Sequence, residues 1–136
     1  MIKKILFSII CICLLSVVSF ADEVNPIDKA EDACISKTSS TADMLRCTNI
    51  AEIAWDKEMN KYYNLLMKKL SPEQKNELLK AQKSWLGFRY NSFTFINNSI
   101  REKQGTMYLN VASGHRREIV KQRALQLKEY YNIISE

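Results

Sequence analysis

Two groups of polar and aromatic residues in the middle of the chain have the spacing of side chains that share one face of a helix. The groups are Asp56, Asn60 and Tyr63, at positions i, i+4 and i+7, and Gln82, Trp85 and Arg89, at i, i+3 and i+7. An arginine can donate two parallel hydrogen bonds to a carboxylate, so Arg89 is suited to bind Asp56. Amide side chains can exchange hydrogen bonds, which makes Asn60 a partner for Gln82. We therefore expect side chains of one group to form hydrogen bonds with side chains of the other.

Carboxylates near the first group raise the alternative of glycoside cleavage, which uses two acidic side chains flanking the scissile bond. The candidates are Glu52, Asp56 and Glu58. Glu52 and Asp56 lie four residues apart on one helix face, where carboxylates are usually solvated or ion-paired, and nothing indicates a cleft. The single histidine, His115, stands alone at an expected helix start. The prediction is that the protein is not an enzyme, has no catalytic residues and needs no cofactor.

Helices must position these side chains, because apolar residues recur at helical spacing along most of the chain. Helices are expected over residues 41–70, 72–104 and 115–134. Ser71, Pro72 and Gln74 form an N-cap, a first-turn proline and a capping-box partner, so one helix ends and another begins there. Gly105 is a natural stop for the second helix.

The short connection at Ser71 predicts that the two long helices fold back on each other. In that register Asp56 faces Arg89, Asn60 faces Gln82, and Trp85 covers the pair from water. A buried ion pair penalises a slipped register, because slippage leaves a charge unpaired. The predicted fold class is all-α: a long antiparallel helical hairpin with a third C-terminal helix packed on it and one disulfide.

The first 21 residues have the features of a secretory signal peptide: a basic start, an apolar run, and small residues before a cut after Ala21. A membrane anchor is the alternative, but the apolar run is short for a span of about 20 residues. The predicted organisation is a signal peptide over 1–21, a loose lead-in segment over 22–33 that ends in a short turn or helix, and a helical domain over 34–134. The mature protein is expected to have no stable membrane anchor.

Two of the four cysteines remain after cleavage, namely Cys34 and Cys47. A pair of cysteines in an oxidising compartment predicts a disulfide. A metal site is the competing interpretation, but one distant histidine leaves zinc without a ligand set. We therefore expect one disulfide and no metal.

Charge excludes one class of partner. Loss of Lys3 and Lys4 with the leader lowers the formal net charge from +5 to +3, without a concentrated basic stripe. Nucleic-acid binding is therefore not expected. The basic residues of the last helix, Arg116, Arg117, Lys121 and Lys128, are expected to form a solvated face, with contact to anionic envelope polymers as the alternative.

The segment 105–114 is a candidate partner-binding loop, because apolar residues lie between glycines. Its candidate contact residues are Met107, Tyr108, Leu109 and Val111. The alternative is that these side chains cover the open end of the helical core, as apolar loop residues usually do.

The chain resembles the LprI-like lysozyme inhibitor family of small exported bacterial domains over residues 34–128. The resemblance is carried by two cysteines, a D-x-x-x-N-x-x-Y motif, an A-Q-x-x-W-x-x-[FY]-R motif and a late arginine: Cys34, Cys47, Asp56, Asn60, Tyr63, Ala81, Gln82, Trp85, Phe88, Arg89 and Arg123. The family commonly has a second cysteine pair, but this chain has Phe93 and His115 near those positions. One disulfide remains.

The resemblance implies an exported protein, in the periplasm or secreted, that binds and inhibits lysozyme or another wall hydrolase and so protects peptidoglycan. A non-inhibitory periplasmic accessory or stress protein that binds another envelope component is the alternative. The positive charge gives no steering toward cationic lysozymes. Acidic residues of the lead-in would compensate if they contact the partner: Asp22, Glu23, Asp28, Glu31 and Asp32.

Overall fold

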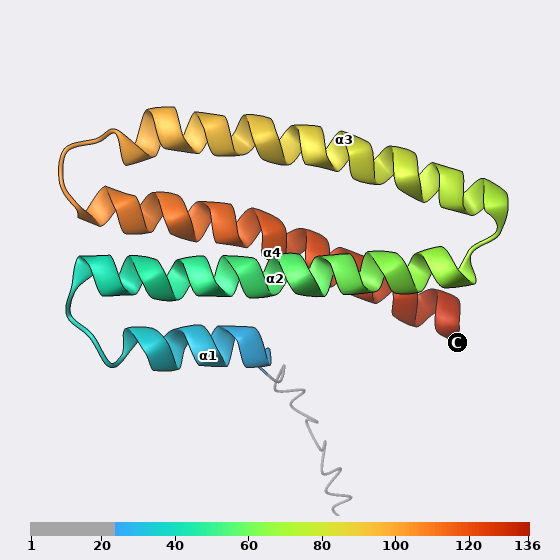
Figure 1. Cartoon of the computed structure of the whole chain (residues 1–136), viewed down its shortest axis with the longest axis horizontal. Coiled ribbons are helices and arrows are strands. Elements are labelled where there is room, and N and C mark those ends of the chain that lie inside the picture. Colours follow the sequence, from blue (N-terminus) through green and yellow to red (C-terminus); the bar gives the residue numbers. More distant parts are fainter. Residues whose placement is uncertain (1–23) are drawn as a thin grey trace, which may run out of the picture.

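The computed structural model describes residues 24–136, which form helices and connecting turns without a strand. The expected signal peptide over 1–21 lies outside the described residues. The elements are α1 (Pro26–Ile35), α2 (Thr41–Lys69), α3 (Pro72–Ile96), a π-helical turn η1 (Asn97–Arg101) and α4 (Met107–Ser135). Figure 1 shows α2, α3 and α4 lying side by side, with α3 running against the direction of the other two and α1 beside α2.

Local signals account for the bounds of α2 and for the start of α3. The Ser40 side chain accepts a hydrogen bond from the backbone nitrogen of Asp43 (3.4 Å) where α2 begins. Ser71 and Gln74 form a complete capping box, in which each side chain binds the other residue's backbone nitrogen. The expected helix over 41–70 and the expected start at Pro72 are therefore confirmed.

The end of α3 and the start of α4 differ from the expectation. The α-helix ends at Ile96, where η1 begins, and the chain turns at Gly105, whose φ is +106°. Residues that carry a side chain rarely adopt a positive φ, so glycine is favoured at this position. α4 begins at Met107, eight residues before the expected start at His115, so the candidate binding loop is helical.

Tertiary contacts explain why α4 continues through Gly114. A glycine inside a helix costs about 1 kcal/mol relative to alanine. The two residues before it, Ala112 and Ser113, are buried, and the Ser113 hydroxyl donates a hydrogen bond to the side-chain oxygen of Asn49 on α2 (2.8 Å). Packing and this contact offset the local preference of glycine.

The core lies mainly between α2 and α4, which corrects the expected packing of the first long helix against the second. Its buried members are Trp55, Met59, Tyr62 and Leu66 from α2, with Val120, Ala124 and Leu127 from α4. The residues of α3 that are buried are Gln82 and Ile96. Because α3 buries few side chains, α4 is the main packing partner of α2.

From residue 24 onward most of the lead-in segment belongs to the helix α1, so the expected loose conformation is wrong there, whereas the expected helix near Cys34 is present. The side chain of Asn25 caps α1 by accepting a hydrogen bond from the backbone nitrogen of Ile27 (2.9 Å), and Pro26 occupies the first turn. The disulfide between Cys34 and Cys47 joins the end of α1 to α2, as the cysteine pair predicts.

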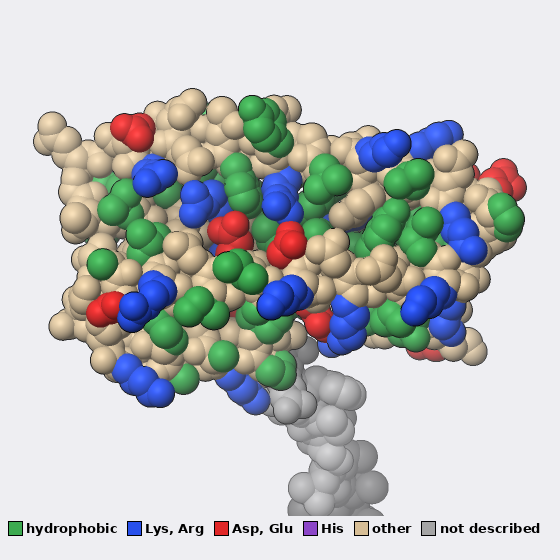
Figure 2. Space-filling view, viewed as in Figure 1, with side chains coloured by type: hydrophobic (Ala, Val, Ile, Leu, Met, Phe, Trp, Pro, Cys, Tyr) green, Lys and Arg blue, Asp and Glu red, His purple; other side chains and the backbone are tan. Residues whose placement is uncertain are grey.

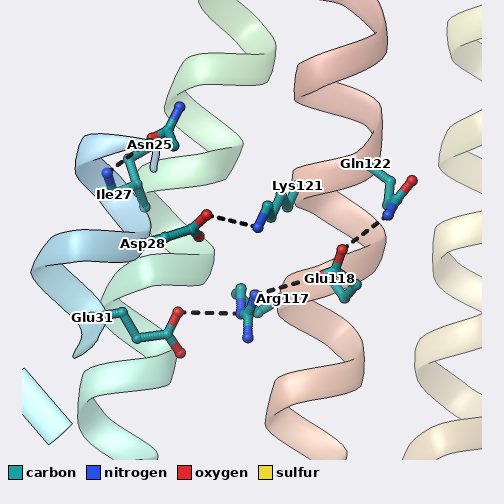
Figure 3. Close-up of polar contacts among 8 residues, drawn as sticks. All are labelled: Asn25, Ile27, Asp28, Glu31, Arg117, Glu118, Lys121 and Gln122. Carbon is teal, nitrogen blue, oxygen red and sulfur yellow. Dashed lines mark hydrogen bonds and ion pairs between the residues drawn. The ribbon is translucent and has the colours of Figure 1, made fainter. Parts of the chain in front are cut away.

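Ion pairs also join α1 to α4 (Figure 3). Asp28 accepts a hydrogen bond from Lys121 (2.7 Å), and Glu31 lies 3.3 Å from Arg117. These two carboxylates are therefore engaged within the protein instead of being free for a partner. The expectation of a solvated basic face on the last helix is wrong for Arg116, Arg117 and Lys121, because each is partly buried and paired with a carboxylate.

None of the helices within residues 24–136 has the length and apolar character needed to cross a membrane.

The carboxylate of Glu52 lies 3.6 Å from the Nε atom of Arg116. Burial raises the pKa of Glu52 above its ordinary value of 4.5, and Asp56 raises it further, although Arg116 and Arg89 act in the opposite direction. A raised pKa favours the protonated carboxyl in the folded state. The contribution of Glu52 to stability is therefore fully present below pH 4.5 and is lost as pH rises through the raised pKa.

We expect the stability of the wild type, measured relative to Glu52→Gln, to fall as pH rises from about 4 to 7, because only the wild type must ionise this buried group. Urea unfolding of both proteins across this range checks the prediction. A difference that stays constant, or that grows in favour of the wild type as pH rises, would contradict it.

Candidate functional site

Arg89 on α3 is held by one carboxylate and two aromatic rings. Its Nη1 atom donates a hydrogen bond to Oδ1 of Asp56 on α2 (2.6 Å). The centre of its guanidinium group lies 5.7 Å from the ring centroid of Trp85 and 5.5 Å from that of Phe93. Both rings are within the range of a cation–π interaction, so they fix the guanidinium group beside Asp56. The pair is not covered from water, since the side chains of Arg89 and Asp56 are 31% and 37% exposed.

Asn60 completes the coordination of Asp56 and does not bind Gln82. Its Nδ2 atom donates hydrogen bonds to Oδ2 of Asp56 (3.0 Å) and to the backbone oxygen of Asp56 (2.9 Å). Residues four apart on a helix are neighbours, so this contact forms without any other helix. The expected amide exchange between Asn60 and Gln82 is therefore wrong.

Gln82 binds Arg123 of α4 instead. Its Oε1 atom accepts hydrogen bonds from Nε (3.0 Å) and Nη2 (2.9 Å) of Arg123, and its Nε2 atom lies 3.7 Å from the sulfur of Met59. The Arg123 guanidinium group also lies 6.0 Å from the Trp85 ring centroid and donates to Gln126. Trp85 therefore interacts with two arginines, and the hydrogen bonds attach α3 to α4.

Arg123 is a buried cation that the sequence identified only as a late arginine. It is 8% exposed, and no carboxylate lies within 4 Å of it in the described part of the chain. Burial lowers the pKa of Arg123, because it disfavours the charged form. Gln82, Gln126 and the face of Trp85 replace part of the lost hydration.

A groove of about 420 Å³ opens between α2 and α3. It is lined by Asp56, Met59, Asn60, Tyr63, Leu79, Gln82, Lys83, Leu86 and Arg89. The D-x-x-x-N-x-x-Y residues thus lie together along one wall, with Arg89 opposite. Figure 2 shows the face that contains α2 and α3, where hydrophobic side chains are exposed among basic and acidic ones. We define this depression as the α2/α3 groove.

The residues of the expected binding loop lie on the first turns of α4. Met107 is 62% exposed and Val111 is 38% exposed, whereas Tyr108 and Leu109 are half-buried. Lys103 lies over the Tyr108 ring, 5.5 Å from its centroid. Their helical conformation leaves no apolar loop that extends from the fold.

The carboxylates considered for glycoside cleavage bind cations in the protein. Glu52 pairs with Arg116, Asp56 with Arg89, and Glu58 with Lys61 (3.2 Å). Within residues 24–136, no three His, Cys, Asp or Glu side chains are grouped so that they can hold a metal ion.

The contact between Asp56 and Arg89 predicts a non-additive mutational response. Arg89→Leu leaves Asp56 without its cation, and Asp56→Leu leaves a half-buried guanidinium group without its carboxylate. The Asp56→Leu/Arg89→Leu double variant should therefore lose less stability than the sum of the two single losses, by about 0.5–3 kcal/mol. Urea unfolding of the four proteins measures this coupling. Additive losses would show that the two residues do not stabilise each other.

The fold and the polar network define a small all-helical, disulfide-bonded domain. Its helix α3 is attached to α2 and α4 through arginine and glutamine side chains. A family model, described as lysozyme inhibitor LprI, matches residues 34–127. The chain belongs to this family.

A solved structure has the same fold over most of this chain. It is the crystal structure of an uncharacterized protein from Burkholderia thailandensis, with a TM-score of 0.78 and 27% sequence identity. The similarity covers 84% of this chain and 57% of that protein, so this chain spans little more than half the length of its relative. No curated protein matches the chain.

Proposed function

We propose that the protein is exported to the cell envelope, where it binds and inhibits a lysozyme or another wall hydrolase and so protects peptidoglycan. The match of the lysozyme inhibitor family to residues 34–127 carries this proposal. The matched region contains both disulfide-bonded cysteines, Cys34 and Cys47, all the network residues and the α2/α3 groove.

Local contacts, and not overall charge, would provide the recognition. The chain is formally positive, and Asp28 and Glu31 already pair with cations of α4. Long-range attraction toward a cationic hydrolase is therefore weak. The exposed apolar side chains of α3 offer a contact surface that needs no such steering; they include Leu79, Leu86, Phe88, Tyr90 and Phe95.

The test is peptidoglycan lysis by a panel of lysozymes and bacterial wall hydrolases, with and without the purified oxidised protein. We expect near-stoichiometric inhibition of at least one enzyme, because a specific protein inhibitor occupies its target at concentrations above the Kd. A helical protein of equal size and charge controls for adsorption to the substrate. Folded protein that inhibits no enzyme of the panel would contradict the proposal, and binding without inhibition would favour the non-inhibitory accessory function.

A further inference from the structure

We infer that the α2/α3 groove is a carboxylate-binding site that accepts an acidic side chain from an extended segment of the protein partner. The inference rests on the proposed function for the kind of partner, a protein, and adds where that partner binds and which chemical group is recognised. It is carried by Arg89, Lys83 and Asn60, whose polar groups line one open groove.

Arg89 is oriented but most of its hydrogen-bonding capacity is unused. A guanidinium group has five N–H donors. Among the described residues, the hydrogen bond of Arg89 is the one to Asp56, while Trp85 and Phe93 hold the plane of the group. Arginine presents its donors in a geometry that matches a carboxylate, and a group fixed in advance loses less entropy on binding.

The position of Arg89 makes these donors accessible. Its side chain is 31% exposed, and it lines both the α2/α3 groove and a second depression of about 390 Å³ that continues along α3. Leu86 also lines both, and Tyr90 and Asn97 lie farther along. A segment of several residues can therefore follow α3 with Arg89 near its middle.

The charges of the groove favour an anion. Lys83 is exposed on the groove wall and forms no ion pair within 4 Å inside the region 24–136. Asp56 is the carboxylate of the groove lining, and both of its oxygens already accept hydrogen bonds from Arg89 and Asn60. The lining therefore holds two cations and one carboxylate, a net charge of +1 that is complementary to a further negative group.

The other lining residues favour a peptide. Both hydrogen bonds of Asn60 are donated to Asp56, so its side-chain oxygen remains available to a backbone N–H of the ligand. Leu79 and Leu86 supply aliphatic surface, since they are 38% and 47% exposed. A groove with aliphatic surface and a few fixed polar groups suits an extended chain with an acidic side chain between apolar ones.

The test measures binding of two peptides, acetyl-Leu-Glu-Leu-amide and acetyl-Leu-Gln-Leu-amide, to the purified oxidised protein by NMR titration. The peptides differ in one charge and have nearly the same shape. We expect saturable shifts at Arg89 and Lys83 with the glutamate peptide, and about fivefold weaker binding of the glutamine peptide, as for a partly exposed ion pair. Equal affinity for the two peptides, or no saturable shift, would overturn the inference.

Lys83→Glu and Lys80→Glu form a matched pair of variants. Both lysines are exposed on α3, and both substitutions change the charge equally, but Lys80 does not line the groove. We expect Lys83→Glu to abolish the preference for the glutamate peptide and Lys80→Glu to keep it, with unchanged circular dichroism for both. Equal losses in the two variants would reduce the effect to net charge and reject the site.

Three further results distinguish this inference from other roles of the groove and from the proposed function. N-acetylmuramic acid that shifts Arg89 while the glutamate peptide does not would make the groove a sugar site and overturn the peptide assignment. A hydrolase that is inhibited equally by wild type and Lys83→Glu would place the inhibitory surface elsewhere, which overturns the inference and leaves the proposed function intact. Peptide binding that depends on Lys83, without inhibition of any hydrolase, would support the site and reject the inhibitor function.

Discussion

Replacing Trp55 with alanine should lower the free energy of unfolding by about 3–5 kcal/mol, the range for a fully buried aromatic side chain. Trp55 is 0% exposed and belongs to the cluster that joins α2 to α4. Its removal takes dispersion contacts from both helices and leaves a cavity at the main packing surface. Chemical denaturation followed by circular dichroism measures the loss, and a shift of this size would be the largest expected here.

Trp55→Phe is the control for this effect. It keeps an aromatic ring in the core and removes the indole Nε1, a buried donor with no hydrogen-bond partner within the described chain. Removal of an unsatisfied donor offsets part of the lost packing. Trp55→Phe should therefore cost less than half as much as Trp55→Ala. Equal costs would indicate that the indole group, and not the aromatic volume, is what the core requires.

The Cys34→Ser/Cys47→Ser double variant should lose about 3 kcal/mol, because the crosslink restricts the unfolded chain. The disulfide joins α1 to α2 across a separation of 13 residues. Without it, α1 is retained by its packing on α2 and by the pairs from Asp28 to Lys121 and from Glu31 to Arg117. The packing of α1 on α2 is less extensive than the packing between α2 and α4, so α1 should detach more readily than either of these two helices.

Hydrogen exchange distinguishes local detachment from global loss. Amides of α1 should exchange faster in the double variant, while the α2 and α4 amides in the core should change only as far as global stability falls. Reductant should lower the urea midpoint of the wild type and leave that of the double variant unchanged. A wild type that is insensitive to complete reduction would refute a stabilising role for the disulfide.

The sequence by itself determined features whose causes lie within a few residues along the chain. The capping box at Ser71 and Gln74 locates the junction of α2 and α3, and Cys34 and Cys47 form the disulfide that the sequence predicts. The opposition of Asp56 and Arg89 also follows from the sequence, because a short connection restricts the register of the helices that it joins. These signals arise from short stretches of sequence, so they can be recognised without knowledge of the fold.

The tertiary structure alone decided which long helix packs against α2. α3 follows α2 directly in the chain, but α4 supplies the apolar surface that buries Trp55. The early start of α4 has the same origin, since burial of Ser113 against α2 outweighs the helix-breaking tendency of Gly114. Local helix propensity does not predict these packing contacts, because they join residues that are far apart in the sequence.

The α2/α3 groove also depends on the fold. Gln82 accepts hydrogen bonds from Arg123, which is 41 residues away, and this contact attaches α3 to α4. The spacing of residues in the sequence had instead predicted Asn60 as the partner of Gln82. Asn60 satisfies both of its donors within its own turn of α2, which leaves Gln82 available to the buried arginine. A buried guanidinium group needs acceptors more than an exposed amide does, and only the packing of α4 determines that Arg123 is buried.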